Sequence, residues 1–136
     1  MSTPYHAGYQ PPFPQLTVVL HAGDDHLGPY TALLDSGADT TLIPSSWLEE
    51  IGAMEGERAR IRSHFGEYQP VRLYVVDIQV QDFLLPGTYV AGNDVSDEII
   101  LGRDVLNRLS LFLDGPQQRG EVLDDAIVKR LRARRE

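Results

Sequence analysis

From residue 16 to residue 114 the chain consists of short apolar runs separated by segments rich in Gly, Asp, Ser and Pro. Runs of this length that are rich in Val, Ile, Leu, Thr and Tyr are typical of β-strands bounded by turns. The segment 58–62 alternates arginine with apolar residues, which favours a half-exposed strand. We therefore predict strands at 16–21, 30–35, 40–44, 58–62, 71–80, 83–92, 99–101 and 110–114, with a loop at 23–29 between the first two.

Three further segments have the pattern of short helices. In the first, either Ser45 or Ser46 can cap the N-terminus, and Gly52 can end the helix. The last begins at Asp124 and ends in arginines, which is the order of charges that the helix macrodipole favours. The apolar sides of the three would consist of Trp47, Leu48 and Ile51; of Val105, Leu106 and Leu109; and of Ile127, Val128 and Leu131.

Together these elements predict one mainly β domain, which is also what a length of 136 residues favours. The first residues are rich in proline and have no periodicity, so we expect 1–15 to be a flexible arm. The arm could be a disordered leader, a segment removed by processing or a ligand that occupies the chain's own site. Residues 115–136 are expected to form a hairpin and then an amphipathic helix.

Charge is distributed unevenly along the chain. Twelve cations and twenty acids give a net charge of −8 at pH 7. Five of the cations lie within the last eight residues, so residues 1–128 carry seven cations and nineteen acids, a net charge of −12. A negative body repels phosphate backbones, and we therefore expect no nucleic-acid partner. The basic end fits the solvated terminus of a helix.

The composition excludes several kinds of site. Cysteine is absent, which removes disulfides, thiolate nucleophiles and cysteine-based metal centres. No apolar run approaches the roughly 18 residues that cross a membrane, and the N-terminus lacks the pattern of a signal peptide. We therefore expect a cytoplasmic protein without membrane contact. Asp24, Asp25 and His26 lack metal-ligand spacing and fit a solvated turn, so we expect no metal or other cofactor.

The sequence ALLDSGAD at 32–39 places a carboxylate directly after an apolar strand and directly before a flexible turn. Asp35 would leave the sheet at its end, where the strand fixes its position and the loop exposes its side chain. Gly37 lets a ligand or a second backbone approach closely, and Ser36 offers a hydroxyl group. Taken alone, Asp-Ser-Gly also fits an ordinary turn.

A second segment, IILGRDVL at 99–106, combines an apolar strand, a glycine and a helix start that contains an arginine. Arg103 follows Asp35 by 68 positions. Over about residues 16–114, the two segments together resemble the retropepsin-like aspartic proteases, the single-lobed relatives of the retroviral proteases. The resemblance implies a closed, mostly antiparallel β-barrel of the acid-protease type with short helices. It also implies an aspartic endopeptidase that hydrolyses peptide bonds.

Carried over residue by residue, the resemblance assigns a role to each position of the two motifs. These implied roles are catalysis by Asp35; support of the active-site loop by Ser36, Gly37 and Gly102; substrate contact by Ala38 and Asp39; and a salt bridge between Asp39 and Arg103 near the dimer contact. A flap is implied at 60–71, where the tip has one glycine instead of the several in retroviral proteases. Its implied substrate contacts are Ser63, His64, Phe65 and Gly66.

One Asp-Ser-Gly motif occurs in the sequence, whereas aspartic-protease chemistry needs two carboxylates. We therefore expect a homodimer in which each subunit supplies one Asp35, with a polypeptide as substrate. The extension 115–136 follows the strand at which retroviral dimers interleave, so it is expected on or near the interface. A rival hypothesis is a catalytically inactive dimer of the same fold that binds peptides or scaffolds an assembly.

Overall fold

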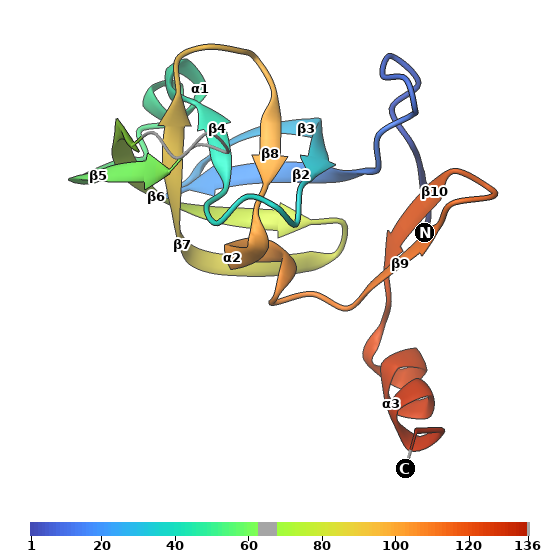
Figure 1. Cartoon of the computed structure of the whole chain (residues 1–136). Helices are drawn as coiled ribbons and strands as arrows, with labels where there is room; N and C mark the ends of the chain where they lie inside the picture. The colour runs from blue at the N-terminus through green and yellow to red at the C-terminus, as the bar shows by residue number, and fades with distance from the viewer. Residues whose placement is uncertain (63–67, 136) are drawn as a thin grey trace.

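A computed structural model describes residues 1–62 and 68–135 of the chain (Figure 1). The strands are β1 (Thr3–Pro4), β2 (Gln15–Ala22), β3 (Asp25–Leu34), β4 (Leu42–Pro44), β5 (Met54–Arg62), β6 (Tyr68–Val80), β7 (Phe83–Asn93), β8 (Ile99–Leu101), β9 (Leu111–Asp114) and β10 (Arg119–Val122). The helices of the described part are α1 (Ser45–Glu50), α2 (Arg103–Leu106) and α3 (Asp125–Ala133). The chain is thus mainly β, as its short apolar runs predict.

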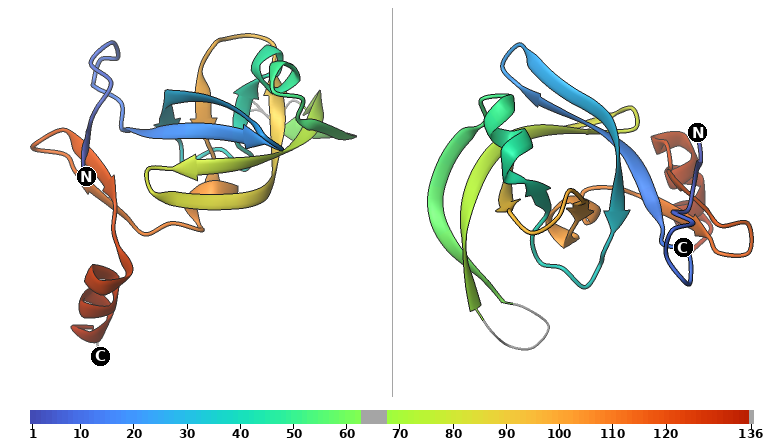
Figure 2. Two further views of the ribbon diagram at one scale, coloured as in Figure 1. Left: turned by 180° about the vertical axis from the view of Figure 1, so that it is seen from behind. Right: turned by 90° about the horizontal axis from the view of Figure 1, so that it is seen from above.

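Six strands close into a barrel (Figure 2). Hydrogen-bonded neighbours follow the order β2-β3-β8-β4-β7-β6, and β6 pairs back with β2 to complete the ring. Strand β5 pairs with β6 outside the ring. The β3–β8 and β4–β7 pairs are parallel and the other four are antiparallel. This architecture confirms the closed, mostly antiparallel barrel, and its parallel pairs join segments that lie far apart in the sequence.

Apolar side chains fill the interior of the barrel. On β2, Leu16, Val18 and Leu20 are almost fully buried and alternate with partly exposed neighbours, as the two-residue period of a strand requires. On β8, Ile99 and Leu101 are buried in the same core. Burial of each such side chain contributes about 1.5–3 kcal/mol, so the core fixes the strand register on which the loops depend.

Helix α1 follows β4 without an intervening loop, which makes the predicted serine cap wrong. The N-cap position is Pro44, and it forms no side-chain capping hydrogen bond. Because β4 runs directly into the helix, Ser45 is already its first helical residue. Gly52 ends the helix with a φ of +69°, as predicted. The partly or fully buried side of the helix consists, as expected, of Trp47, Leu48 and Ile51.

The turn between β2 and β3 is tighter than the predicted loop at 23–29. Strand β3 already begins at Asp25, and His26 pairs with His21 of β2. Gly23 and Asp24 remain as the turn, with Gly23 at a φ of +58°. The polar residues at the start of β3 are compatible with pairing because their side chains are mostly exposed.

A second, smaller sheet has the strand order β1-β10-β9 (Figure 1). In it Thr3 of the N-terminal arm pairs with Gly120, so this arm contains a short strand. The hairpin of β9 and β10 leads into α3, where the Asp124 carboxylate accepts a hydrogen bond from the Ile127 backbone N–H at 2.9 Å. The helix predicted to begin at Asp124 is thereby confirmed.

The rest of the arm lies beside the end of β3, the strand that Asp35 directly follows. The Pro14 carbonyl accepts a hydrogen bond from the Leu34 N–H at 3.0 Å, and the Tyr9 hydroxyl donates to Glu98. The neighbours of Leu33 on β3, Ala32 and Leu34, belong to the barrel core, whereas Leu33 does not. Leu33 is nevertheless only 7% exposed. The cover over Leu33 must therefore come from outside the barrel, where the arm and the second sheet lie.

Candidate active site

Asp35 directly follows the last residue of β3. Its backbone N–H still donates to the Leu101 carbonyl of β8 at 3.0 Å, so the residue is held at the edge of the barrel. Its carboxylate accepts a hydrogen bond from the Gly37 N–H at 2.9 Å, and its carbonyl accepts one from the Ala38 N–H at 3.1 Å. The side chain is half-buried. Asp35 is thus fixed in orientation while part of its surface faces solvent.

Strand β8 is followed by Gly102, which lies against the loop that follows Asp35. A Cβ atom at this position would lie 2.9 Å from the Ala38 carbonyl oxygen and 2.8 Å from the Thr40 carbonyl carbon. The next residue, Arg103, donates its backbone N–H to that same Ala38 oxygen at 2.8 Å. Because these contacts are with backbone atoms, a side chain at position 102 would push the loop away. The loop therefore rests directly on the backbone at position 102.

A buried hydrogen-bond network that we did not predict joins the same two segments. The carboxylate of Asp104 accepts bonds from the Thr41 N–H at 3.0 Å and the Thr41 hydroxyl at 2.7 Å. The Thr41 hydroxyl in turn accepts from the Gly102 N–H at 3.1 Å. Thr41 is fully buried and Asp104 is half-buried, so these bonds are partly shielded from water. The feature of the sequence that could have indicated this network is the acid Asp104, which follows Arg103 in the second motif.

Arg103 and Asp39 form an ion pair, as the resemblance implies. The arginine also donates to the Ser36 carbonyl oxygen at 2.7 Å, so it spans the whole turn. Both side chains are largely exposed, and an exposed pair contributes at most about 1 kcal/mol to stability. Ser36 and Gly37 are exposed and Ala38 is half-buried. The loop therefore presents an accessible surface beside Asp35.

The segment predicted as a flap belongs to the hairpin of β5 and β6. Arg60 pairs with Pro70 and Ala59 with Val71 in antiparallel register. The predicted tip residues Ser63, His64, Phe65 and Gly66 lie outside the described residues. The structure therefore describes the arms of a hairpin at the predicted place.

Two hollows on the described surface lie away from Asp35. The larger, of about 430 Å³, lies between the hairpin of β5 and β6 and helix α1, where Arg58, Arg72, Glu49 and Tyr74 line it. The smaller, of about 250 Å³, is lined by the segment 93–97, Pro44 and Ser46. Asp35 borders neither. A ligand bound at Asp35 would therefore contact residues other than those that line these two hollows.

Two tyrosines next to carboxylates have raised pKa values. The hydrogen bond that Tyr9 donates to Glu98 raises the pKa of Tyr9. Burial raises the pKa of Tyr74, and the nearby charge of Glu49 adds to this shift. Both phenols stay protonated at neutral pH and act there as hydrogen-bond donors.

Among residues 1–62 and 68–135, no three His, Asp or Glu side chains are grouped so that they could hold a metal ion. Asp24 and Asp25 are exposed on the turn between β2 and β3. None of the helices in the same ranges is long and apolar enough to cross a membrane.

Residues 25–108, more than half of the chain, match the family described as "gag-polyprotein putative aspartyl protease". The chain belongs to this aspartyl protease family, which confirms the retropepsin-like resemblance of its two motifs. No curated protein matches the sequence. Among solved structures, the EIAV protease complexed with the inhibitor HBY-793 is similar, with a TM-score of 0.52 and 24% identity over 71% of this chain and 86% of that chain. This likeness supports the same fold.

A second solved structure is the retroviral protease-like domain of Ddi1 from Leishmania major. Its TM-score is 0.47 and its identity 16%, over 82% of this chain and 96% of that chain.

Replacing Gly102 by alanine should destabilise the protein by about 1–3 kcal/mol, because its Cβ would displace the backbone at Ala38 and Thr40. Urea unfolding measures the change. Gly115→Ala is the matched control, since a Cβ there meets nothing within 4 Å. Equal midpoints for the two variants would show that the loop does not rest on Gly102.

Replacing Thr41 by valine should lower the free energy of unfolding by about 1–3 kcal/mol, because the Asp104 carboxylate loses a buried donor. Thr31→Val, at an exposed position of β3, provides the control for the change from hydroxyl to methyl. Chemical denaturation of both variants checks this. A Thr41→Val protein as stable as the control would refute the network.

Proposed function

We propose that the protein is an aspartic endopeptidase that hydrolyses peptide bonds as a homodimer, with one Asp35 from each subunit. The observation that carries the proposal is the anchored, half-exposed Asp35 carboxylate at the end of β3, in a chain of the aspartyl protease family. A single Asp-Ser-Gly motif supplies half of the required carboxylate pair. A twofold axis next to the 35–39 loop would supply the other half.

In such a centre the two carboxylates would share one proton, because two like charges at close range cannot both ionise readily. The ionised carboxylate accepts a proton from water as the water oxygen attacks the peptide carbonyl carbon. The protonated carboxyl group donates to the carbonyl oxygen. When the carbon–nitrogen bond breaks, the amine nitrogen takes the proton that the first carboxylate accepted from water, and one hydroxyl of the tetrahedral diol returns its proton to the second carboxylate, so the pair again holds one proton. The pKa values of this titration belong to the pair and not to either Asp35 alone.

An extended polypeptide would bind between the loop that carries Ala38 and Asp39 and a flap at 60–71. Strand-like pairing with the substrate would use backbone donors and acceptors of the loop and of the flap. Closure of the flap would exclude water from the reacting bond. The assignment of Ser63, His64, Phe65 and Gly66 to the flap tip stays a prediction, and so does the cytoplasmic location.

Strand β9 is our candidate for part of the subunit interface. It pairs with β10 on one side, and no strand of the described part pairs with its other edge. Phe112 and Leu113 on β9 are each 48% exposed. An exposed apolar edge strand favours pairing with a second chain. In this proposal 16–114 is the protease domain, 1–15 is the arm and 115–136 extends the domain near the interface.

Replacing Asp35 by asparagine should lower cleavage of an unfolded polypeptide by at least about a thousandfold, because the general base is lost. The amide oxygen can still accept the hydrogen bond from Gly37, so the fold and the dimer should persist. Cleavage is followed over a range of pH, with and without pepstatin, and the dimer by sedimentation.

Asp24→Asn provides the control, because it removes an exposed carboxylate from the turn at the opposite end of β3 from the motif. It should leave cleavage unchanged. Full activity of the Asp35→Asn protein would refute the assignment. A stable wild-type dimer that cleaves nothing at any pH would favour the catalytically inactive, peptide-binding alternative.

A further inference from the structure

Helix α3 stands apart from the barrel. It follows β10 and the second sheet, and Figures 1 and 2 agree that it lies clear of the barrel strands. Its start is tied down by a backbone hydrogen bond from Leu123 to Ser110 at 2.8 Å. A helix of nine residues is marginally stable alone in water, and most helices of this length depend on packing of one face. This packing is incomplete in the single chain.

The apolar side of α3 is only partly covered. Ile127, Val128 and Leu131 recur at the spacing of one helix face. Val128 is 8% exposed, but Leu131, one turn further on, is 46% exposed. Two further large apolar side chains, Phe112 and Leu113, are exposed on β9 of the preceding hairpin. This end of the molecule therefore exposes apolar surface on both β9 and α3.

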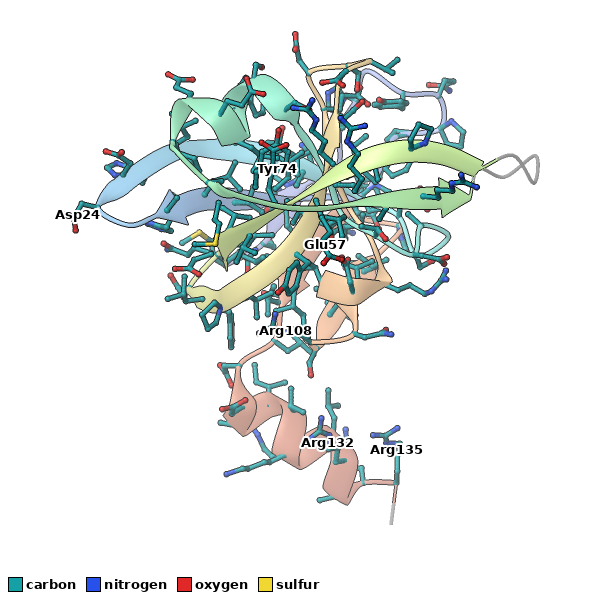
Figure 3. All side chains as sticks on the ribbon, turned by 90° about the vertical axis from the view of Figure 1, so that its left-hand side faces the viewer. Asp24, Glu57, Tyr74, Arg108, Arg132 and Arg135 are labelled. Carbon is teal, nitrogen blue, oxygen red and sulfur yellow. The ribbon has the colours of Figure 1, made fainter. Side chains whose placement is uncertain are left out.

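The polar side of α3 carries a concentrated positive charge. Its cations are all exposed, and Figure 3 shows the labelled Arg132 and Arg135 at the end that lies away from the barrel. No ion pair is recorded between any of them and a residue within 1–62 or 68–135. Residues 1–128 have the opposite sign, with a net charge of −12. The cations concerned are Lys129, Arg130 and Arg132 on α3 and Arg134 and Arg135 directly after it.

We propose that α3 of each protomer docks on the acidic body of a second copy of this chain. Docking would cover Leu131 and bring the cations of the helix within a Debye length, about 8 Å, of the opposite charges. It would also continue the interface proposed for β9, because the two elements are linked through β10. This inference rests on the proposed homodimer and names a surface that holds it together.

Charge favours the acidic body of a second copy as the partner of α3 over two other partners, the α3 helix of that copy and a nucleic acid. Pairing residues 129–135 with their copy would oppose five cations to five cations, which is unfavourable. A nucleic acid would be attracted by the helix but repelled by a body with a net charge of −12. The second copy offers both the negative charge and, on β9, exposed apolar side chains.

Lys129 is the sole lysine of the sequence, which permits a direct test. Equal amounts of unlabelled and nitrogen-15-labelled protein are mixed and treated with a zero-length carbodiimide, which joins amines to contacting carboxylates. Mass spectrometry should find mixed-isotope peptides that link Lys129 to Asp or Glu residues within 15–108. Lys129→Arg keeps the charge and should remove these links. Links confined to one chain, links to α3 of the other copy, or none would overturn the proposal.

Dimer strength provides the second measurement. Replacing Arg130 and Arg132 together by glutamine should raise the dissociation constant at least about tenfold, or about 1.4 kcal/mol, and weaken its salt dependence. Replacing Arg58 and Arg72 by glutamine removes the same charge from the barrel hairpin and should not raise the dissociation constant, because it makes the acidic body more negative. Truncation after Leu123 removes the whole helix. It should weaken the dimer at least as much as replacing Arg130 and Arg132 by glutamine does, whether or not that double replacement also loosens the helix.

Sedimentation equilibrium at low and moderate salt gives these constants. Equal constants for the wild type, the glutamine pair and the truncated chain would contradict the docking of α3 while leaving the proposed protease dimer intact. A wild-type protein that stays monomeric at every concentration would contradict both. Binding of a short RNA that is lost with Arg130 and Arg132, without any Lys129 links between chains, would assign the helix to a nucleic acid instead.

Discussion

The site depends on the parallel register of β3 and β8. Because Leu34 pairs with Leu101, the end of one strand lies level with the end of the other. Asp35 can then donate its N–H to β8, and Gly102 comes to lie against the loop. Parallel neighbours need a long connection, and here the intervening chain builds β4, β6 and β7, three of the six barrel strands. The position of one carboxylate is therefore set by closure of the whole sheet.

Two sets of polar contacts hold the loop, and they differ in strength. The pair of Arg103 and Asp39 is exposed and contributes at most about 1 kcal/mol. The contacts of Asp104 with Thr41 are partly buried and depend on a fully buried threonine, whose loss as a partner costs about 1–3 kcal/mol. This network therefore contributes more to the stability of the loop than the exposed ion pair does. The exposed arginine mainly fixes the shape of the turn through its bond to the Ser36 carbonyl.

The sequence predicted the features that depend on local periodicity and on paired motifs: the barrel strands, the inner side of α1, the start of α3 and Asp35 at a strand end. It missed features set by contacts between distant residues. A threonine just before a strand carries no sign of its partner, so the bonds of Thr41 to Asp104 were not foreseen. Strand β1 is two residues long, too short for any period. The tight turn at Gly23 and the proline cap of α1 depend on how neighbouring strands run.

The central claim is that one chain holds half of a catalytic centre. Mixing wild-type and Asp35→Asn protein at constant total concentration, with full subunit exchange, tests it most directly. If each centre needs both carboxylates, cleavage should follow the square of the wild-type fraction, with about one quarter of the activity in an equal mixture. Activity proportional to the wild-type fraction, with about one half remaining, would show that each chain works alone and would contradict the account.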